Sequence, residues 1–244
     1  MSFIDIHCHI LPGIDDGPGD MQESLEMAGM AIADGISVVF ATPHIMDGVY
    51  ANTTLKIKEA FRNLQTGLPE GITLLYGADV RISPDMIERI ERGDIPTLNG
   101  SGYLLMELPQ FVIPPFMNEF VSHLKQQKTT PILTHPERHP LMSRNLTFLR
   151  NLRSSGAMIQ ITAQSITGAF GKDIRRASIL MIEKGLVDFV ATDAHDCRKR
   201  PPQLSAAYRE VEALFDYETA RRLFRLNQER ILEAIDSAEA TFKR

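Results

Sequence analysis

Two histidines and three aspartates crowd the stretch FIDIHCHILPGIDDGP at residues 3–18. His7 and His9 are two residues apart, so on a strand both imidazoles project from the same face. Imidazole and carboxylate groups together suit Zn²⁺, Mn²⁺ or Fe²⁺ better than Ca²⁺ or a thiolate-bound cluster. The stretch therefore predicts metal chemistry, provided that the fold brings further ligands to the same place.

The elements that would position these residues alternate along the chain, as in parallel strands joined by crossover helices. Short apolar runs rich in β-branched residues predict seven strands, at 3–8, 36–42, 72–78, 103–107, 131–135, 158–163 and 187–192. Amphipathic stretches predict helices at 21–34, 54–66, 83–92, 115–127, 144–155 and 173–184, and the segment 202–235 is helical in pattern. Seven such units in one undivided domain, residues 1–244, favour a closed or nearly closed barrel over an open sheet.

The ionisable residues lie where the predicted strands end. In a parallel barrel these ends form one rim, where active sites are assembled. A lone His or Asp there is commonly structural or a helix N-cap, but six of the seven strands carry one, which favours a shared metal site. With Asp16 from the first loop, the candidate ligands are His7, His9, His44, Asp79, Glu107, His135, Asp193 and His195. These nine residues fit two or three ions, with Glu107 as the natural bridge.

Composition excludes several other classes. A net charge of −5 does not indicate a nucleic-acid partner, and no apolar run approaches the ~20 residues that span a membrane. With no signal-peptide pattern, we expect a cytoplasmic protein without membrane insertion, its two cysteines reduced. The absence of GxxxxGK[ST] excludes a P-loop NTPase. A cysteine-dependent tyrosine phosphatase needs Cys-x₅-Arg, but the corresponding positions after Cys8 and Cys197 hold Ile14 and Gln203.

Seven motifs occur in a set order: HxH at 7–9, DDGP at 15–18, ATPH at 41–44, YGAD at 76–79, IPTLN at 95–99, HPER at 135–138 and TDAH at 192–195. This set resembles the polymerase and histidinol phosphatase (PHP) superfamily. Within it, the chain is most similar to the bacterial manganese-dependent tyrosine phosphatases of capsule and exopolysaccharide gene clusters. The resemblance extends to RPP at 200–202 and implies a distorted (β/α)7 TIM-like barrel with its metal site at the C-terminal rim of the strands.

The resemblance also implies a trinuclear centre of divalent ions, with Mn²⁺ expected and Fe or Zn as alternatives. By motif position, the three ions would be held by His7, His9, Glu107 and Asp193; by Asp79, Glu107 and His135; and by Asp16, His44 and His195. Arg138 and Arg200 would bind the substrate phosphate, which a guanidinium fork matches. Two departures stand out: Asp79 replaces the usual glutamate and is one methylene shorter, and QITAQ at 160–164 receives no role.

The implied activity is hydrolysis of phosphotyrosine in proteins by metal-activated hydroxide, in the control of capsular or exopolysaccharide synthesis, with a cognate bacterial tyrosine kinase as the expected partner. One alternative is a phosphatase for a small metabolite, histidinol phosphate or a sugar phosphate; another is a silent binding module, against which the complete ligand set argues. A protein substrate needs an open cleft with an apolar wall, for which the candidates are Tyr50, Phe111, Val112, Ile113 and Phe116. The sequence leaves the oligomeric state open.

Overall fold

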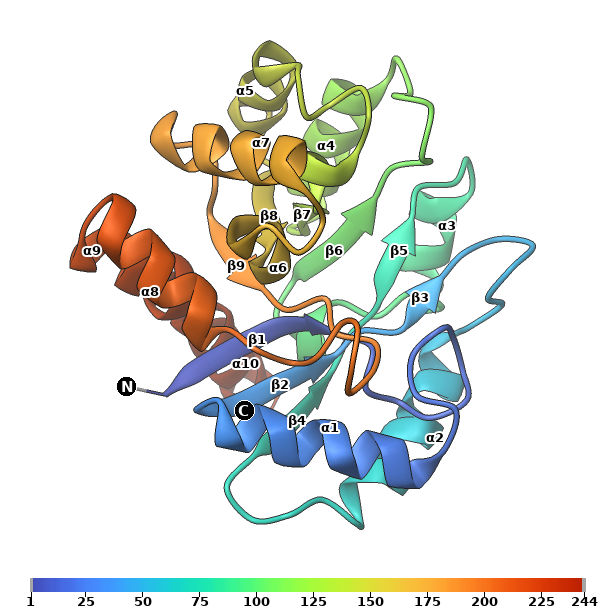
Figure 1. Cartoon of the computed structure of the whole chain (residues 1–244). Coiled ribbons are helices and arrows are strands. Elements are labelled where there is room, and N and C mark those ends of the chain that lie inside the picture. Colours follow the sequence, from blue (N-terminus) through green and yellow to red (C-terminus); the bar gives the residue numbers. More distant parts are fainter. Residues whose placement is uncertain (1, 243–244) are drawn as a thin grey trace.

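A computed structural model describes residues 2–242 and shows helices packed around parallel strands (Figure 1). The strands are β1 (Phe3–Cys8), β2 (Ile36–Ala41), β3 (His44–Ile45), β4 (Thr73–Tyr76), β5 (Asp79–Arg81), β6 (Tyr103–Glu107), β7 (Thr130–Thr134), β8 (Met158–Thr162) and β9 (Phe189–Ala191). The helices are α1 (Met21–Ala33), α2 (Thr54–Gln65), α3 (Met86–Glu91), α4 (Met117–Gln126), α5 (Leu146–Ser154), α6 (Ala163–Thr167), α7 (Lys172–Glu183), α8 (Ser205–Leu214), α9 (Tyr217–Arg221) and α10 (Asn227–Phe242). The α/β class with parallel strands is thus confirmed.

Two of the predicted strands, 36–42 and 72–78, are each followed by a further short strand that was not predicted, and the strands are divided between two sheets. The sheets have the orders β1-β2-β4 and β3-β5-β6-β7-β8-β9. Between β2 and β3, Pro43 lacks the N–H that a continuous ladder needs, and between β4 and β5 the chain passes through Gly77. A Cβ at Gly77 would lie 2.6 Å from Leu98 Cδ2, so any larger residue would have to displace the buried Leu98 side chain. Because β3 pairs with β5 as β2 pairs with β4, the two short strands continue the longer ones beyond the breaks.

The two sheets also meet at the other margin, where β1 ends beside the segment that follows β9. The Asp193 backbone N–H donates to the His7 carbonyl over 2.8 Å, and the His9 N–H donates to the Ala194 carbonyl over 2.8 Å. Cys8 and Ala194 form a parallel bridge at the same place. The loops that carry the first and last motifs are therefore fixed to each other by backbone hydrogen bonds.

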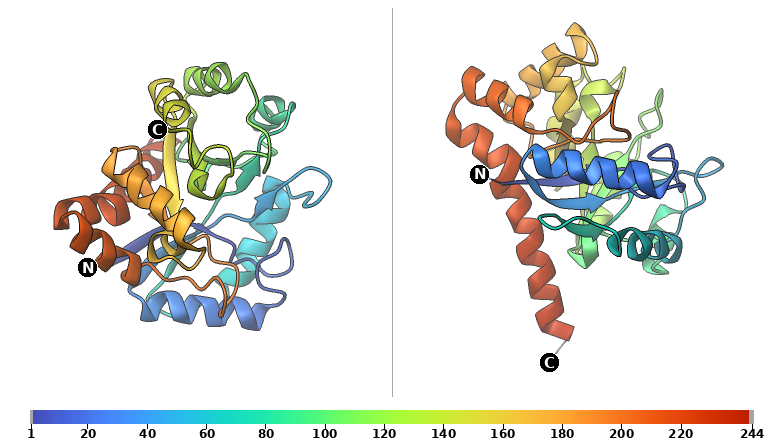
Figure 2. Two further views of the ribbon diagram at one scale, coloured as in Figure 1. Left: turned by 45° about the horizontal axis from the view of Figure 1, so that its top comes forward. Right: turned by 60° about the horizontal axis from the view of Figure 1, so that its bottom comes forward.

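The helices cover the outside of the strands, and the predicted ones match to within a few residues (Figure 2). The sequence prediction missed the short helix α6, whose first residue was assigned to the preceding strand. Helix α10 packs against β1, and its Ile231 and Ile235 join a buried apolar cluster with Ile4, Ile6 and Phe40 from the strands. Among residues 2–242, no helix combines the length and apolarity needed to cross a membrane.

Candidate metal centre

The predicted ligands converge in one place. Each lies at or just beyond the carboxyl end of a parallel strand, except Asp16, which lies in the first loop. Their donor atoms form four overlapping groups, within each of which all lie within 4.8 Å of one another. The groups are His9, Asp16, His44 and His195; His7, His135 and Asp193; His7, His9 and Asp79; and His44, Asp79 and Glu107. All nine predicted ligands are therefore brought together, although their role as ligands stays a prediction.

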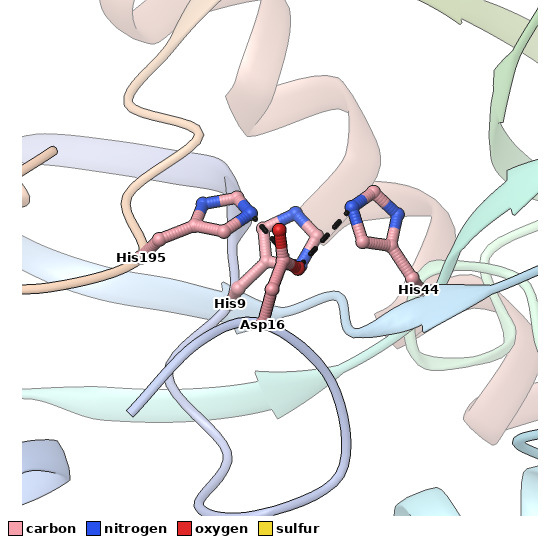
Figure 3. Close-up of side chains that lie close together, drawn as sticks. All are labelled: His9, Asp16, His44 and His195. Atoms are coloured by element: carbon pink, nitrogen blue, oxygen red, sulfur yellow. Dashed lines mark ion pairs between the residues drawn. The ribbon is translucent and has the colours of Figure 1, made fainter. Parts of the chain in front are cut away.

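Asp16 lies between His44 and His195, which are far apart in the sequence (Figure 3). Its Oδ1 is 3.4 Å from His195 Nε2 and 3.6 Å from His44 Nε2. The sequence grouped these three residues, and the structure adds His9, whose ring centroid is 3.8 Å from that of His195. The imidazoles are buried and the Asp16 side chain is half exposed, so this group lies at the solvent side of the cluster.

Asp193 contacts both His7 and His9 and the two arginines predicted to bind phosphate, which are Arg138 and Arg200. Its Oδ1 is 3.3 Å from both His7 Nε2 and His9 Nε2. Its Oδ2 accepts hydrogen bonds from Arg200 Nη2, over 2.5 Å, and from Arg138 Nη2. Asp193 has a φ of 51°, a left-handed conformation that costs a non-glycine residue of order 1–3 kcal/mol. Such strain is typical of functional sites, and the candidate ligand His135 shares it, with a φ of 38°.

Asp79 lies deep in the cluster despite its short side chain. Its Oδ2 is 3.4 Å from His44 Nδ1, 3.7 Å from His7 Nε2 and 3.9 Å from His135 Nε2. The predicted bridge, Glu107, lies 3.7 Å from His135 Nε2 through its Oε2. The sequence also placed Glu107 with His7, His9 and Asp193, and this grouping stays a prediction. In the structure its donor atom lies within 4.8 Å of those of His44 and Asp79.

Glu107 also contacts an arginine that the sequence analysis did not single out. Arg81, at the end of β5, reaches Glu107 Oε1 with Nε at 3.1 Å and Nη2 at 3.0 Å. The same Glu107 oxygen lies 3.9 Å from His44 Nδ1, so Arg81 and the cluster share it. Arg81 follows Asp79 by two residues on the same strand, which is the only signal in the sequence that marks it.

Two residues that the sequence analysis left without a role orient the imidazoles of His7, in β1, and His9, directly after it. Gln160 Oε1 lies 3.0 Å from His7 Nδ1, and Asp15 Oδ2 lies 2.8 Å from His9 Nδ1. With each Nδ1 occupied, both Nε2 atoms face the cluster, where they are 3.1 Å apart. A hydrogen bond on the remote nitrogen is the usual way in which a metal-binding histidine is fixed. Asp15 also accepts hydrogen bonds from the backbone N–H groups of His44 and Gly17, both over 3.0 Å.

The electrostatics of the cluster favour a cation. Burial lowers the pKa of His7 to about 3, which keeps its imidazole in the neutral form that binds metals. Burial also disfavours a charge on His9, but the Asp15 and Asp193 carboxylates raise its pKa to about 10. Burial would raise the pKa of Asp193, yet two arginines and His7 hold it well below its usual range. Concentrated carboxylate charge therefore attracts positive charge to the place where the imidazole nitrogens meet.

Unpartnered buried atoms provide a direct test of whether the residues fit metal ions. His44 Nδ1, His195 Nε2 and Asp79 Oδ2 are buried, and each lacks a hydrogen-bond partner within the described residues 2–242. Buried polar atoms are rarely left so, because an unpaired group costs free energy. All three belong to the groups described above, and imidazole nitrogen with carboxylate oxygen is the donor set of Zn²⁺, Mn²⁺ or Fe²⁺. The residues fit divalent ions of this type.

Comparison with known proteins agrees with this geometry. The family model for capsular polysaccharide synthesis proteins CpsB/CapC matches residues 3–233. The chain belongs to this family. It is 36% identical over 218 residues to the putative tyrosine-protein phosphatase CapC of Staphylococcus aureus, covering 88% of this chain and 86% of that protein. It is 38% identical over 200 residues to the tyrosine-protein phosphatase YwqE of Bacillus subtilis (strain 168), covering 81% and 79%.

Solved structures share the fold of this chain. A crystal structure from work on YwqE of Bacillus subtilis and CpsB of Streptococcus pneumoniae, described as unique metal-dependent tyrosine phosphatases, matches with a TM-score of 0.89 at 33% identity. That match covers 96% of this chain and 94% of the other. The lactonase Lmo2620 of Listeria monocytogenes, at 13% identity and a TM-score of 0.55, shares the fold alone. The resemblance drawn from the motifs is thus confirmed.

Proposed function

We propose that this chain is a metal-dependent protein-tyrosine phosphatase that acts in capsular or exopolysaccharide synthesis. The observation that carries the proposal is the convergence of nine imidazole and carboxylate side chains with two arginines at one end of the strands. The names of CapC, YwqE and CpsB as tyrosine-protein phosphatases support the reaction, and the family description supports the link to capsule synthesis.

The cluster would hold two or three divalent ions, with Mn²⁺ expected and Fe or Zn as alternatives. When bound, such ions activate water as a nucleophile and neutralise charge on a phosphoryl group. The residues that would hold them are His7, His9, Asp16, His44, Asp79, Glu107, His135, Asp193 and His195. Asp15 and Gln160 would keep the imidazoles of His9 and His7 in the orientation that this requires.

Arg138 and Arg200 would bind the non-bridging oxygens of the phosphate. They come from different loops, and both donate to Asp193 Oδ2 through one Nη2 atom. The side chains of Arg138 and Arg200 are 21% and 25% exposed, so part of each guanidinium can meet a substrate oxygen. Charge that develops on the phosphoryl oxygens would be stabilised by these donors, which is the main task of protein side chains in phosphoryl transfer.

The surroundings of the cluster favour a protein-borne phosphotyrosine over a small metabolite. Tyr50 stacks on His44, with ring centroids 5.8 Å apart and an interplanar angle of 10°. After β6, Phe111, Val112 and Phe116 are 70%, 54% and 46% exposed. Exposed apolar side chains grouped in one loop are typical of interaction sites. An enzyme for a metabolite would enclose its ligand, so an open apolar loop near the rim supports a macromolecular substrate.

The cysteines are poorly suited to act as nucleophiles. Burial raises the pKa of the Cys8 thiol well above its usual value, and the side chain is fully buried. Burial and two nearby glutamates also raise the pKa of Cys197. Because the thiolate is the reactive form, neither residue would attack a phosphate readily.

The finer expectations from the resemblance belong to the same proposal. The single domain would be a distorted (β/α)7 barrel, supported by the backbone hydrogen bonds between the end of β1 and the segment after β9. The substrate would be a cognate bacterial tyrosine kinase, and the protein would act in the cytoplasm.

The experiment that tests the proposal compares substrates and metals with the purified protein. We expect hydrolysis of a phosphotyrosyl peptide, its loss on chelation and its recovery with Mn²⁺, together with a much lower kcat/KM for histidinol phosphate. A higher kcat/KM for histidinol phosphate than for the peptide would favour the metabolite phosphatase. Hydrolysis of neither compound by the Mn²⁺-loaded protein would favour the silent binding module.

A further inference from the structure

A groove of about 700 Å³ lies beside the candidate metal centre, between α7 and the loop 139–145. Its lining includes the apolar residues Pro140, Ile174 and Leu180 and the basic residues Arg144 and Arg176. Helix α7 packs directly against the turn that follows His135, so the groove is built on the same loop that supplies Arg138. A volume of this size can take up a few residues of a polypeptide, and the apolar lining residues can contact its aliphatic side chains.

The groove is basic in a chain whose net charge is −5. Arg144 and Arg176 are both exposed, and neither has an ion-pair partner among residues 2–242. By contrast, the neighbouring Arg175 is paired with Glu210. Lys172 lines a second hollow that shares Arg176, and the one acid in its lining, Glu183, is paired with Lys184.

Acidic residues do little to neutralise this surface. Glu137 lines the groove, but it is buried and its Oε1 accepts hydrogen bonds from the Thr162 N–H at 2.9 Å and the Ser165 hydroxyl at 2.6 Å. Asp173 is the one exposed acid among the residues that line the groove, against two exposed arginines. The exposed charge of the groove is therefore positive, and a negatively charged ligand is favoured there.

Arg138 links the groove to the candidate metal centre. It lines the groove, its guanidinium lies 5.3 Å from the centroid of the Phe170 ring, and its Nη2 donates to Asp193. A phosphate bound by Arg138 would thus lie at the inner end of the groove. A polypeptide that carries this phosphate on a tyrosine would have its neighbouring residues directed along the groove or away from it.

We propose that this groove binds the part of the substrate protein next to the phosphotyrosine, and that it selects acidic side chains there. The proposal rests on the proposed phosphatase function and adds a preference to it. Charge complementarity supports the proposal, because the unpaired Arg144 and Arg176 line the same groove as Arg138, which would bind the phosphate. Exposed ion pairs are weak individually, so we expect two of them to change kcat/KM by about 3–10-fold.

The test uses two phosphotyrosyl peptides that differ only in glutamate or glutamine at the positions flanking the phosphotyrosine. We expect the wild-type protein to hydrolyse the glutamate peptide with the higher kcat/KM, and added salt to reduce the difference. The double variant Arg144→Glu/Arg176→Glu should lose or reverse this preference. Its kcat/KM for free phosphotyrosine should stay unchanged, because that substrate does not reach the groove.

A matched control is the double variant Arg62→Glu/Arg230→Glu, which makes the same charge change at two exposed arginines on α2 and α10. It should keep the wild-type preference. An equal loss of preference in both double variants would overturn the groove, since the effect would then be one of overall charge. Equal kcat/KM for the two peptides in the wild type would also overturn the groove and leave the phosphatase function intact. Hydrolysis of neither peptide would overturn both.

Discussion

Asp15 offers a sharp test of how the metal cluster is organised, because it touches the cluster without belonging to any of its groups. It accepts hydrogen bonds from His9 Nδ1 at 2.8 Å and from the backbone N–H groups of His44 and Gly17 at 3.0 Å. The Asp15 side chain thus fixes both the imidazole of His9, directly after β1, and the backbone of His44, a second candidate ligand, in β3. Replacing it changes the positions of candidate ligands and removes none of them.

The size of the effect follows from the three hydrogen bonds. Asp15→Asn keeps the volume but replaces one acceptor oxygen by a donor, so either Gly17 N–H or the His9 and His44 donors face another N–H. A buried donor left unsatisfied costs about 1–3 kcal/mol. Loss of a residue that orients a metal-bound histidine typically costs 10–100-fold in metal affinity or activity. We therefore expect Asp15→Asn to lower Mn²⁺ affinity by about 10–100-fold and the free energy of unfolding by about 1–3 kcal/mol.

Mn²⁺ titration by calorimetry and urea unfolding measure the two effects separately. Asp34→Asn is the matched control. Asp34 also accepts three hydrogen bonds, from the Leu204 N–H at 2.6 Å, the Ser205 N–H at 2.8 Å and the Ser205 hydroxyl at 2.6 Å. It belongs to none of the candidate ligand groups. The control should lose stability and keep its Mn²⁺ affinity. If Asp15→Asn lowers stability as the control does and binds Mn²⁺ like the wild type, the orienting role is refuted.

Four further substitutions test the same site. Gln160→Leu removes the acceptor at His7 Nδ1 and should lower Mn²⁺ affinity about 10-fold, with normal affinity contradicting an orienting role. Gly17→Ala places a Cβ 2.2 Å from the His9 carbonyl, so the loop must shift and affinity should fall about 10–100-fold; an unchanged crystal structure would contradict this. Arg138→Ala and Arg200→Ala should each lower kcat/KM on a phosphotyrosyl peptide about 10²–10³-fold with metal content unchanged, and lysine should restore activity only in part. Wild-type kcat/KM in either alanine variant would remove that arginine from the site.

The sequence predicted the location of the cluster because strand ends and residue types follow simple rules. Apolar runs mark the strands, parallel strands end on one side, and His7, His44, His135 and Asp193 each follow such a run. Convergence of residues that are far apart in the sequence then follows from the fold alone. The short strands β3 and β5 were not predicted, because they have only two and three residues and no apolar run of their own.

The residues that orient the ligands could not be predicted, because their role depends on distances across the fold. Asp15 and Asp16 are adjacent and identical, yet one lies behind His9 and the other faces His44 and His195. Gln160 lies inside β8, where an amide gives no signal of its own until β8 is placed near β1. Periodicity identifies the strand on which a residue lies but carries no information about the partner of a single polar side chain.

The number of Mn²⁺ ions that bind to the metal-free protein tests the central claim most directly. Calorimetric titration of the purified chain, stripped with a chelator and dialysed, gives this number. Nine converging donors predict two or three ions per chain, with phosphotyrosine phosphatase activity returning as the sites fill. Full activity in protein that binds no divalent ion would contradict the account.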